Sequence, residues 1–201
     1  MKAKEVRGQE FDEVEVMRRL QSGDTAALQQ IMDIFWNSLM ALALQFLNDR
    51  DDAADITQMA FVRLWNHRGD WQPGSLRSYL FRLTRNLALD KIRAEKARSN
   101  RQQASAPPPP RTPEEVFECD EVIGQVDQAV QSLSPRRREV FTLAYLHGLS
   151  YRQIAEIMGI SENTVCNQMT KALSELRQAL QSLIDSGSVG SKVVGRVRSS
   201  K

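Results

Sequence analysis

The sequence of 201 residues is poor in cysteine and histidine, and these shortages narrow the classes of protein to which it can belong. Its two cysteines, Cys119 and Cys166, cannot form a disulfide framework, and a reduced cytoplasmic compartment fits such a chain. Its two histidines, His67 and His147, have no cysteine or histidine at ligand spacing, so we predict no metal site. No long apolar run is present, and we therefore expect no membrane insertion.

The sequence also lacks the usual signs of catalysis. It contains no nucleophile paired with a base at a recognisable spacing, and it has no glycine-rich phosphate loop. We therefore expect no catalytic residue and no cofactor, and we do not expect an enzyme.

Apolar residues recur at helical spacing, and no stretch alternates as a β-strand would. The four consecutive prolines of 107–110 cannot lie inside a helix and favour an extended linker. The pattern predicts an all-α fold of two small helical domains joined by a flexible proline-rich linker, with a helix-turn-helix in the second. The expected ranges are 1–98 for the first domain, 99–112 for the linker, 113–183 for the second domain and 184–201 for a disordered basic tail.

The second domain contains the helix start and stop signals of a helix-turn-helix. Ser150 followed three residues later by Gln153 predicts a capping box, and Gly159 suits the end of the helix that follows. Ser161 can cap another helix only two residues later. Two helices joined by so short a turn cross steeply, as they do in DNA-binding helix-turn-helix proteins.

The second helix of this motif presents a polar, amide-rich face, and asparagine can pair with adenine in the major groove. Its stretch 160–171, "ISENTVCNQMTK", holds one lysine and one glutamate, so its net charge is zero. The alternative is a helical hairpin whose polar face is merely solvated. If the helix does read DNA, the Arg136-Arg137-Arg138 run and the basic segment described next would have to supply affinity.

The first domain combines a basic helix with an aromatic loop. Between residues 75 and 101 the eight cations and two acids give 8 − 2 = +6, which suits phosphate binding or, alternatively, a solvated helix face. The loop before it carries Trp71, which could stack on a base of single-stranded nucleic acid or could cover the core. The helix over 52–65 is apolar on both sides and is either buried or docked on a partner.

Four segments in order resemble the bacterial RNA polymerase sigma factors of the extracytoplasmic-function group. They are "GDTAALQQIMDIFW", "DAADITQMAFVRLW", "GSLRSYLFRLTRNLALDKIR" and "LSPRRREVFTLAYLHGLSYRQIAEIMGISENTVCNQMTKALSELR". The second is similar to the family pattern D-A-E-D-x-x-Q-E-x-F-x-x-x-W, and the last also fits other helix-turn-helix regulators. The resemblance extends over about residues 11–183 and implies a transcription initiation factor that recognises promoter −10 and −35 elements and aids melting.

The resemblance implies roles for particular residues. Contact with the clamp helices of the polymerase β′ subunit falls on Asp55, Gln58, Phe61 and Trp65. Contact with the −10 region, including the melted non-template strand, falls on His67, Arg68, Asp70, Trp71, Gln72, Arg82, Asn86, Asp90 and Arg93. Contact with the −35 duplex falls on Ser161, Asn163, Thr164, Cys166, Asn167, Gln168, Thr170 and Lys171. The second domain would also touch the β flap, and an anti-sigma factor is an expected further partner.

The sequence departs from the family at several of these positions. Met59 replaces an acid, Tyr79 replaces a tryptophan, and Cys166 and Gln168 replace two cations of the −35 helix. The competing hypothesis is a polymerase-independent helix-turn-helix regulator. Such proteins usually bind as dimers on paired half-sites.

Overall fold

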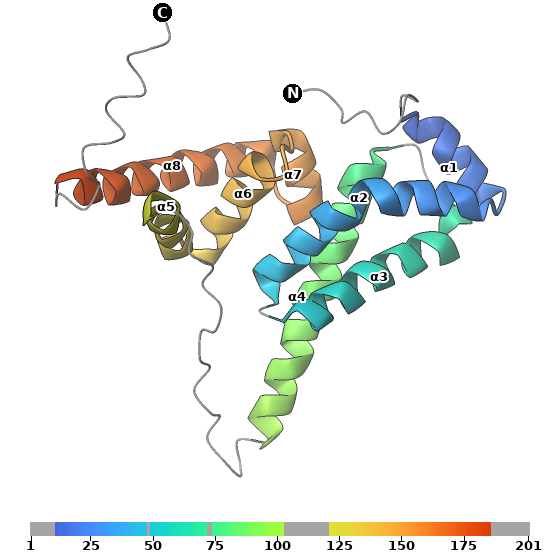
Figure 1. The fold of residues 1–201 in the computed structure, drawn as a ribbon, viewed down its shortest axis with the longest axis horizontal. Coiled ribbons are helices and arrows are strands. Elements are labelled where there is room, and N and C mark those ends of the chain that lie inside the picture. The colour runs from blue at the N-terminus through green and yellow to red at the C-terminus, as the bar shows by residue number, and fades with distance from the viewer. Residues whose placement is uncertain (1–10, 48, 72–73, 103–120, 186–201) are drawn as a thin grey trace, which may run out of the picture. The chain divides into compact units, whose positions relative to one another are not determined.

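The computed structural model of the protein describes residues 11–47, 49–71, 74–102 and 121–185, and in these ranges all regular structure is helical. The chain divides into two compact units (Figure 1). In chain order the helices are α1 (Glu13–Gln21), α2 (Thr25–Phe46), α3 (Arg50–Asn66), the 3-10 turn η1 (Arg68–Asp70), α4 (Leu76–Gln102), α5 (Glu121–Ser132), α6 (Pro135–Tyr145), α7 (Tyr151–Met158) and α8 (Glu162–Asp185). The all-α prediction is confirmed. The proline-rich stretch and the expected basic tail from residue 186 onwards lie outside the described residues.

The first unit is built on three helices, α2, α3 and α4, which pack against one another, while α1 packs on α2. One cluster of their buried side chains includes Leu47, Ile56 and Leu87, with Met40 and Leu83 packed around it. Fully burying a side chain of this size stabilises the fold by about 1.5–3 kcal/mol. None of the described helices is long and apolar enough to cross a membrane.

Aspartate side chains begin three of these helices. Asp12, Asp24 and Asp49 each accept a backbone N–H from the first turn of α1, α2 and α3, respectively. This arrangement satisfies N–H groups that have no partner within the helix, and the negative charge suits the helix dipole. Helix α4 runs to Gln102 rather than ending near residue 98, so the first residues of the expected linker continue the helix.

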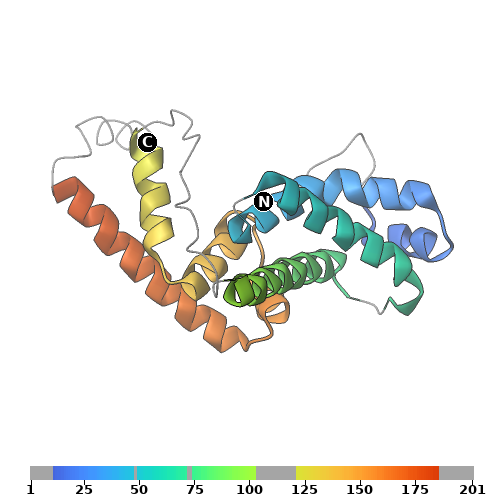
Figure 2. The same ribbon diagram turned by 90° about the horizontal axis from the view of Figure 1, so that it is seen from below.

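In the second unit, α5 and α6 both pack against α8 (Figure 2). Ala129 and Leu133 of α5 meet Ala172 and Leu176 of α8 in one buried cluster. Ala179 and Leu180 extend this contact along α8. Its second half is a structural support for the domain.

The turn of the helix-turn-helix has the predicted geometry. The Ser150 hydroxyl accepts the N–H of Gln153, whose side-chain carbonyl accepts the N–H of Ser150. Gly159 ends α7 in the left-handed conformation with φ 64° and ψ 41°. The Ser161 hydroxyl then accepts the Thr164 N–H at 3.1 Å and begins α8.

Replacing Gly159 by alanine will destabilise the second unit by about 1–2 kcal/mol, because a Cβ disfavours the left-handed conformation. Nothing lies within 4 Å of the position that a Cβ would take, so backbone strain alone causes the loss. Differential scanning calorimetry of the full chain measures the effect. Gly69→Ala is the matched control, since Gly69 has equal space but no positive φ. Equal unfolding temperatures for the two variants would contradict this explanation.

Candidate functional site

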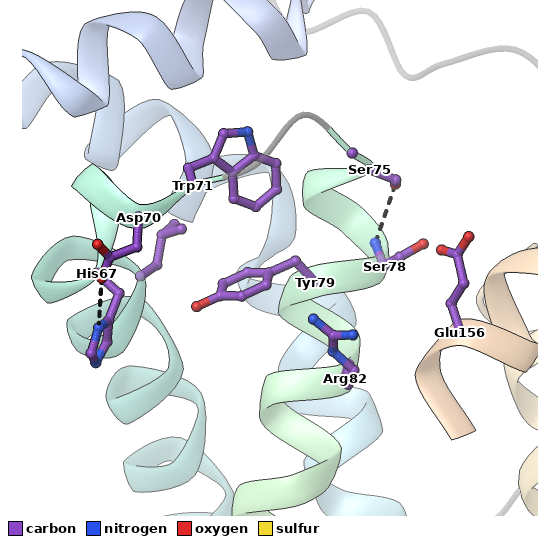
Figure 3. A pocket seen from close by; sticks show the side chains of 10 residues that line it. His67, Asp70, Trp71, Ser75, Ser78, Tyr79, Arg82 and Glu156 are labelled. Carbon is purple, nitrogen blue, oxygen red and sulfur yellow. Dashed lines mark hydrogen bonds and ion pairs between the residues drawn. The ribbon is translucent and has the colours of Figure 1, made fainter. Parts of the chain in front are cut away.

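A surface hollow lies where the loop after α3 meets the start of α4 (Figure 3). The Trp71 ring meets the Tyr79 ring edge-on, with centroids 5.3 Å apart, and the Arg82 guanidinium carbon lies 6.0 Å from the Tyr79 centroid. The residues of the first unit that line it are Leu64, His67, Asp70, Trp71, Gly74, Ser75, Ser78, Tyr79 and Arg82. Two aromatic rings beside a cation form a site that suits a nucleic-acid base next to its phosphate.

In the loop after α3, some side chains are exposed to solvent and one turns back onto the helix. His67 and Asp70 are exposed and lie 3.5 Å apart, so they form an ion pair when the imidazole is protonated. Arg68 turns back on α3: its guanidinium donates to the Trp65 carbonyl at 2.7 Å and lies 4.3 Å from the Trp65 ring centroid. Arg68 is therefore not among the residues that line the hollow. The predicted Gln72 lies outside the described residues.

The basic stripe of α4 has fewer free cations than its sequence indicates. Lys91 forms an ion pair with Asp52 of α3, and this hydrogen bond raises the Lys91 pKa. Arg85 is buried. Arg82 and Asn86 are exposed, as is Arg93, whose guanidinium contacts the Asp90 carboxylate at 3.0 Å. The predicted −10 residues on this helix thus remain accessible from solvent.

An exposed face of α3 combines polar and apolar side chains. Asp55 and Gln58 are exposed, as are Met59 (42%) and Val62 (49%), and these four occupy positions i, i+3, i+4 and i+7. Side chains at this spacing lie on one face of a helix. The sequence left open whether this helix is buried on all sides. In the structure one side of α3 is exposed. We call these four residues the α3 face.

The structure corrects the prediction for Phe61. Its side chain is 2% exposed and stacks on Trp36 with centroids 6.0 Å apart and an interplanar angle of 8°. Helix α3 packs on both α2 and α4, so the buried part of its circumference is wide enough to include Phe61. Trp65 is half-buried beneath Arg68. Phe61 therefore belongs to the core and not to the α3 face.

Helix α8 separates its buried and exposed sides as the sequence indicates. Val165, Met169, Ala172 and Leu176 are buried, whereas Leu173 is 37% exposed because it lies at the edge of the apolar stripe. The exposed predicted residues are Ser161, Asn163, Cys166, Asn167, Thr170 and Lys171. Asn163, Asn167 and Lys171 follow one another at intervals of four and form a line along the helix.

Some of the predicted −35 residues also have structural roles. Besides capping α8, the Ser161 hydroxyl lies 2.8 Å from the Thr164 hydroxyl. Thr170 donates to the Cys166 carbonyl at 2.9 Å. Thr164 and Gln168 are half-buried, and Cys166 is an exposed free thiol. The residues with the most freedom to contact a base are therefore Asn163, Asn167 and Lys171.

Two side chains of the Arg136-Arg137-Arg138 run have partners within the second unit. Arg137 forms an ion pair with Glu175 of α8. Arg138 donates to the carbonyls of Gln131 and Leu133 at the end of α5. Arg137 and Arg138 therefore hold the helices of the second unit together. Of the three arginines, only Arg136 is exposed.

Sequence reasoning missed three contributors to these surfaces. Tyr79 lies three residues before Arg82, so the shared helix face could have indicated its place in the hollow. Met59 and Val62 follow Asp55 at offsets of four and seven, which is the same kind of signal.

Comparison with known proteins identifies both units. Residues 36–98 match the model for sigma-70 region 2, and residues 123–176 match that for sigma-70 region 4. Two solved structures share the fold with a TM-score of 0.61: CnrH in complex with the cytosolic domain of CnrY, at 23% identity, and RpoE in complex with the anti-sigma factor NepR from Bartonella quintana, at 22%. They cover 84% and 76% of this chain, and each match covers 96% of the other chain.

Among curated relatives, the chain is 30% identical over 168 residues to the ECF RNA polymerase sigma factor SigL of Mycobacterium tuberculosis, covering 81% of this chain and 93% of SigL. It is 28% identical to the RNA polymerase sigma-H factor of Pseudomonas aeruginosa, covering 88% and 97% of the two chains. It is also 28% identical to SigE of Mycolicibacterium smegmatis, covering 79% of this chain but only 65% of SigE, just under two thirds. The chain therefore belongs to the extracytoplasmic-function (ECF) family of RNA polymerase sigma factors, which are regulatory transcription initiation factors.

Proposed function

We propose that this sigma factor directs core RNA polymerase to its promoters by holding a base of the melted −10 element in the hollow of the first unit. The observation that carries this proposal is the grouping of Trp71, Tyr79 and Arg82 at the mouth of the loop. Taking a base out of the stack costs a few kcal/mol. Stacking on an aromatic side chain contributes about 1–3 kcal/mol per base and offsets that cost. Arg82 and Asn86 would contact the adjoining phosphates.

The α3 face is the proposed docking surface for the clamp helices of the polymerase β′ subunit. It offers Asp55 and Gln58 for polar contacts and Met59 and Val62 for apolar burial. Apolar side chains flanked by polar ones are typical of the core and rim of a protein interface. Because Met59 stands where the family has an acid, this chain would rely more on apolar contact there.

The outward face of α8 is the proposed reader of the −35 duplex. Asn163 and Asn167 can each pair with an adenine, and Lys171 can contact guanine or a phosphate. With Arg137 and Arg138 committed to α8 and α5, only Arg136 of this arginine run remains to supply affinity. We therefore propose that the unit depends on polymerase, including the β flap, to hold it on the duplex.

Replacing Cys166 by arginine will tighten binding of the holoenzyme to −35 duplex DNA, because the residue is exposed beside the proposed reading line. One added phosphate contact steepens the dependence of log affinity on log salt by about 0.9. Fluorescence anisotropy over a salt series measures both quantities.

Two control variants distinguish a local contact from added charge. Cys166→Ser keeps the site neutral and should change neither quantity. Gln178→Arg adds the same charge at another exposed position of α8, further from its first turn. If Gln178→Arg tightens binding as much as Cys166→Arg, the helix does not enter the groove as proposed.

We further propose that an anti-sigma protein holds this factor inactive in the cytoplasm. Two similar proteins of known structure were each solved in a complex, CnrH with the cytosolic domain of CnrY and RpoE with the anti-sigma factor NepR. We propose that the anti-sigma protein covers the α3 face, because covering this surface would by itself prevent docking on polymerase.

Run-off transcription tests the proposed function. Core polymerase with the purified protein is supplied with fragmented genomic DNA of the source organism, and the 5′ ends of the transcripts are mapped. The proposal requires new 5′ ends with a shared upstream sequence that neither component produces alone. A protein that gives no new transcripts but binds paired half-sites by itself would instead be a polymerase-independent regulator.

A further inference from the structure

Helix α1 is connected to the loop of the proposed base-binding hollow by a single carboxylate. Glu13, in the first turn of α1, accepts a hydrogen bond from the backbone N–H of Leu76, 63 residues away. It also receives a backbone hydrogen bond from Arg77. Leu76 and Arg77 are the first two residues of α4. The side chain of one helix thus caps the start of another.

This contact completes the cap of α4. The first N–H groups of a helix have no partner within it and must be satisfied from outside. The Ser75 hydroxyl accepts the Ser78 N–H at 3.2 Å, and the Tyr79 N–H reaches the Ser75 carbonyl at 3.0 Å. Ser75 therefore serves the third and fourth groups of α4, and the first two depend on Glu13.

Helix α1 also contacts η1, the part of the loop that follows α3. It is itself held firmly on the first unit. Val16, Met17 and Leu20 are buried, and Arg19 forms an ion pair at 2.7 Å with Asp24, the cap of α2. One rigid helix therefore contacts both ends of the segment that carries Trp71.

We infer that Glu13 is a positioning residue for the proposed base-binding hollow, fixing the start of α4 so that Tyr79 and Arg82 face Trp71. This inference rests on the proposed function of the hollow. Tyr79 is one helical turn beyond Ser75 and Arg82 is nearly two, so loss of the first-turn hydrogen bonds shifts both relative to the loop. Burial raises the Glu13 pKa, while the hydrogen bond from Arg77 lowers it. A neutral amide at this half-buried position would keep the acceptor oxygen without the cost of partly burying a charge.

Three variants test the inference. Glu13→Ala removes the acceptor, and Glu13→Gln keeps it. Glu15→Ala is the matched control on the same helix, because Glu15 forms a surface ion pair with Arg18. We expect Glu13→Ala to weaken binding of single-stranded −10 DNA to the holoenzyme about 3- to 30-fold, the range that corresponds to loss of a helix cap. Glu13→Gln and Glu15→Ala should stay within about twofold of the wild type.

Two further measurements separate positioning from general damage. Affinity for core polymerase should change by less than about twofold in Glu13→Ala, because the α3 face does not depend on the cap. Hydrogen exchange of the free protein should speed up at residues 74–79 and not in α2 or α3. Glu13→Asp keeps the charge but shortens the reach of the side chain, so we expect the same losses as for Glu13→Ala. It replaces Glu13→Ala in these measurements if the alanine variant folds poorly.

Wild-type exchange and wild-type DNA binding in Glu13→Ala would overturn the inference, and so would equal losses of DNA and polymerase binding. A failure of the proposed function looks different. In that case the wild-type holoenzyme itself would not bind the single strand, while the exchange measurement would still report the cap.

Discussion

Replacing Trp71 by alanine is expected to reduce the affinity of the holoenzyme for single-stranded −10 DNA about 5- to 150-fold, the equivalent of the 1–3 kcal/mol contributed by one base stack. The side chain is half-buried and meets Tyr79 edge-on at 5.3 Å, and we propose that its exposed part stacks on a base. Promoter opening should fall in parallel, because the captured base is part of the open state. Anisotropy of a labelled oligonucleotide measures the affinity.

The sequence left open whether Trp71 instead covers the core, and this experiment decides between the roles. Trp71→Phe keeps a stacking ring and should recover most of the affinity. Tyr145→Ala removes an aromatic ring that is 61% exposed in the second unit and should leave single-strand binding unchanged. A Trp71→Ala protein that unfolds at a lower temperature but binds the oligonucleotide normally would assign Trp71 to the core.

Placing lysine at both Met59 and Val62 is expected to reduce the affinity for core polymerase at least about 30-fold, because lysine is opposite in charge to the acid that the family has at position 59. Residues central to an interface typically cost about 2 kcal/mol or more when lost, and each 1.4 kcal/mol is a factor of ten. Because both side chains are already exposed, the new charges should cost the free protein little stability. Titration of labelled protein with core polymerase measures the affinity.

Val14 provides the matched control for this double variant. It is 79% exposed on α1 and does not belong to the α3 face, so Val14→Lys should bind polymerase normally. Phe61→Leu offers a second comparison, since a buried side chain should change stability and not docking. Normal polymerase affinity in the double variant would move the docking surface away from α3.

The helix boundaries could be predicted because they depend on local chemistry. Ser150, Gly159 and Ser161 each act within a few residues of their own position, through a side-chain cap or a left-handed backbone. The polar face of α8 followed from local sequence in the same way, and Asn163, Asn167 and Lys171 on it are exposed. Local signals of this kind need no knowledge of the tertiary fold.

The sequence predictions were wrong or incomplete where tertiary contacts determine which side chains are buried or paired. Phe61 and Val62 are neighbours of similar hydrophobicity, and only the packing of α2 and α4 around α3 buries one and exposes the other. Arg136, Arg137 and Arg138 look alike in the sequence, yet partners on α8 and α5 occupy the last two. The cap supplied by Glu13 spans 63 residues, and no local pattern indicates it.

The central claim is that this chain opens promoters only together with core polymerase, and permanganate reactivity of unpaired thymines tests it most directly. The template is a promoter mapped by the run-off experiment, incubated with the protein, with core polymerase, or with both. We predict reactive thymines in the −10 region only when both are present, and their loss with Trp71→Ala. Unreactive thymines in the complete mixture, with the protein alone protecting a palindromic duplex, would contradict it.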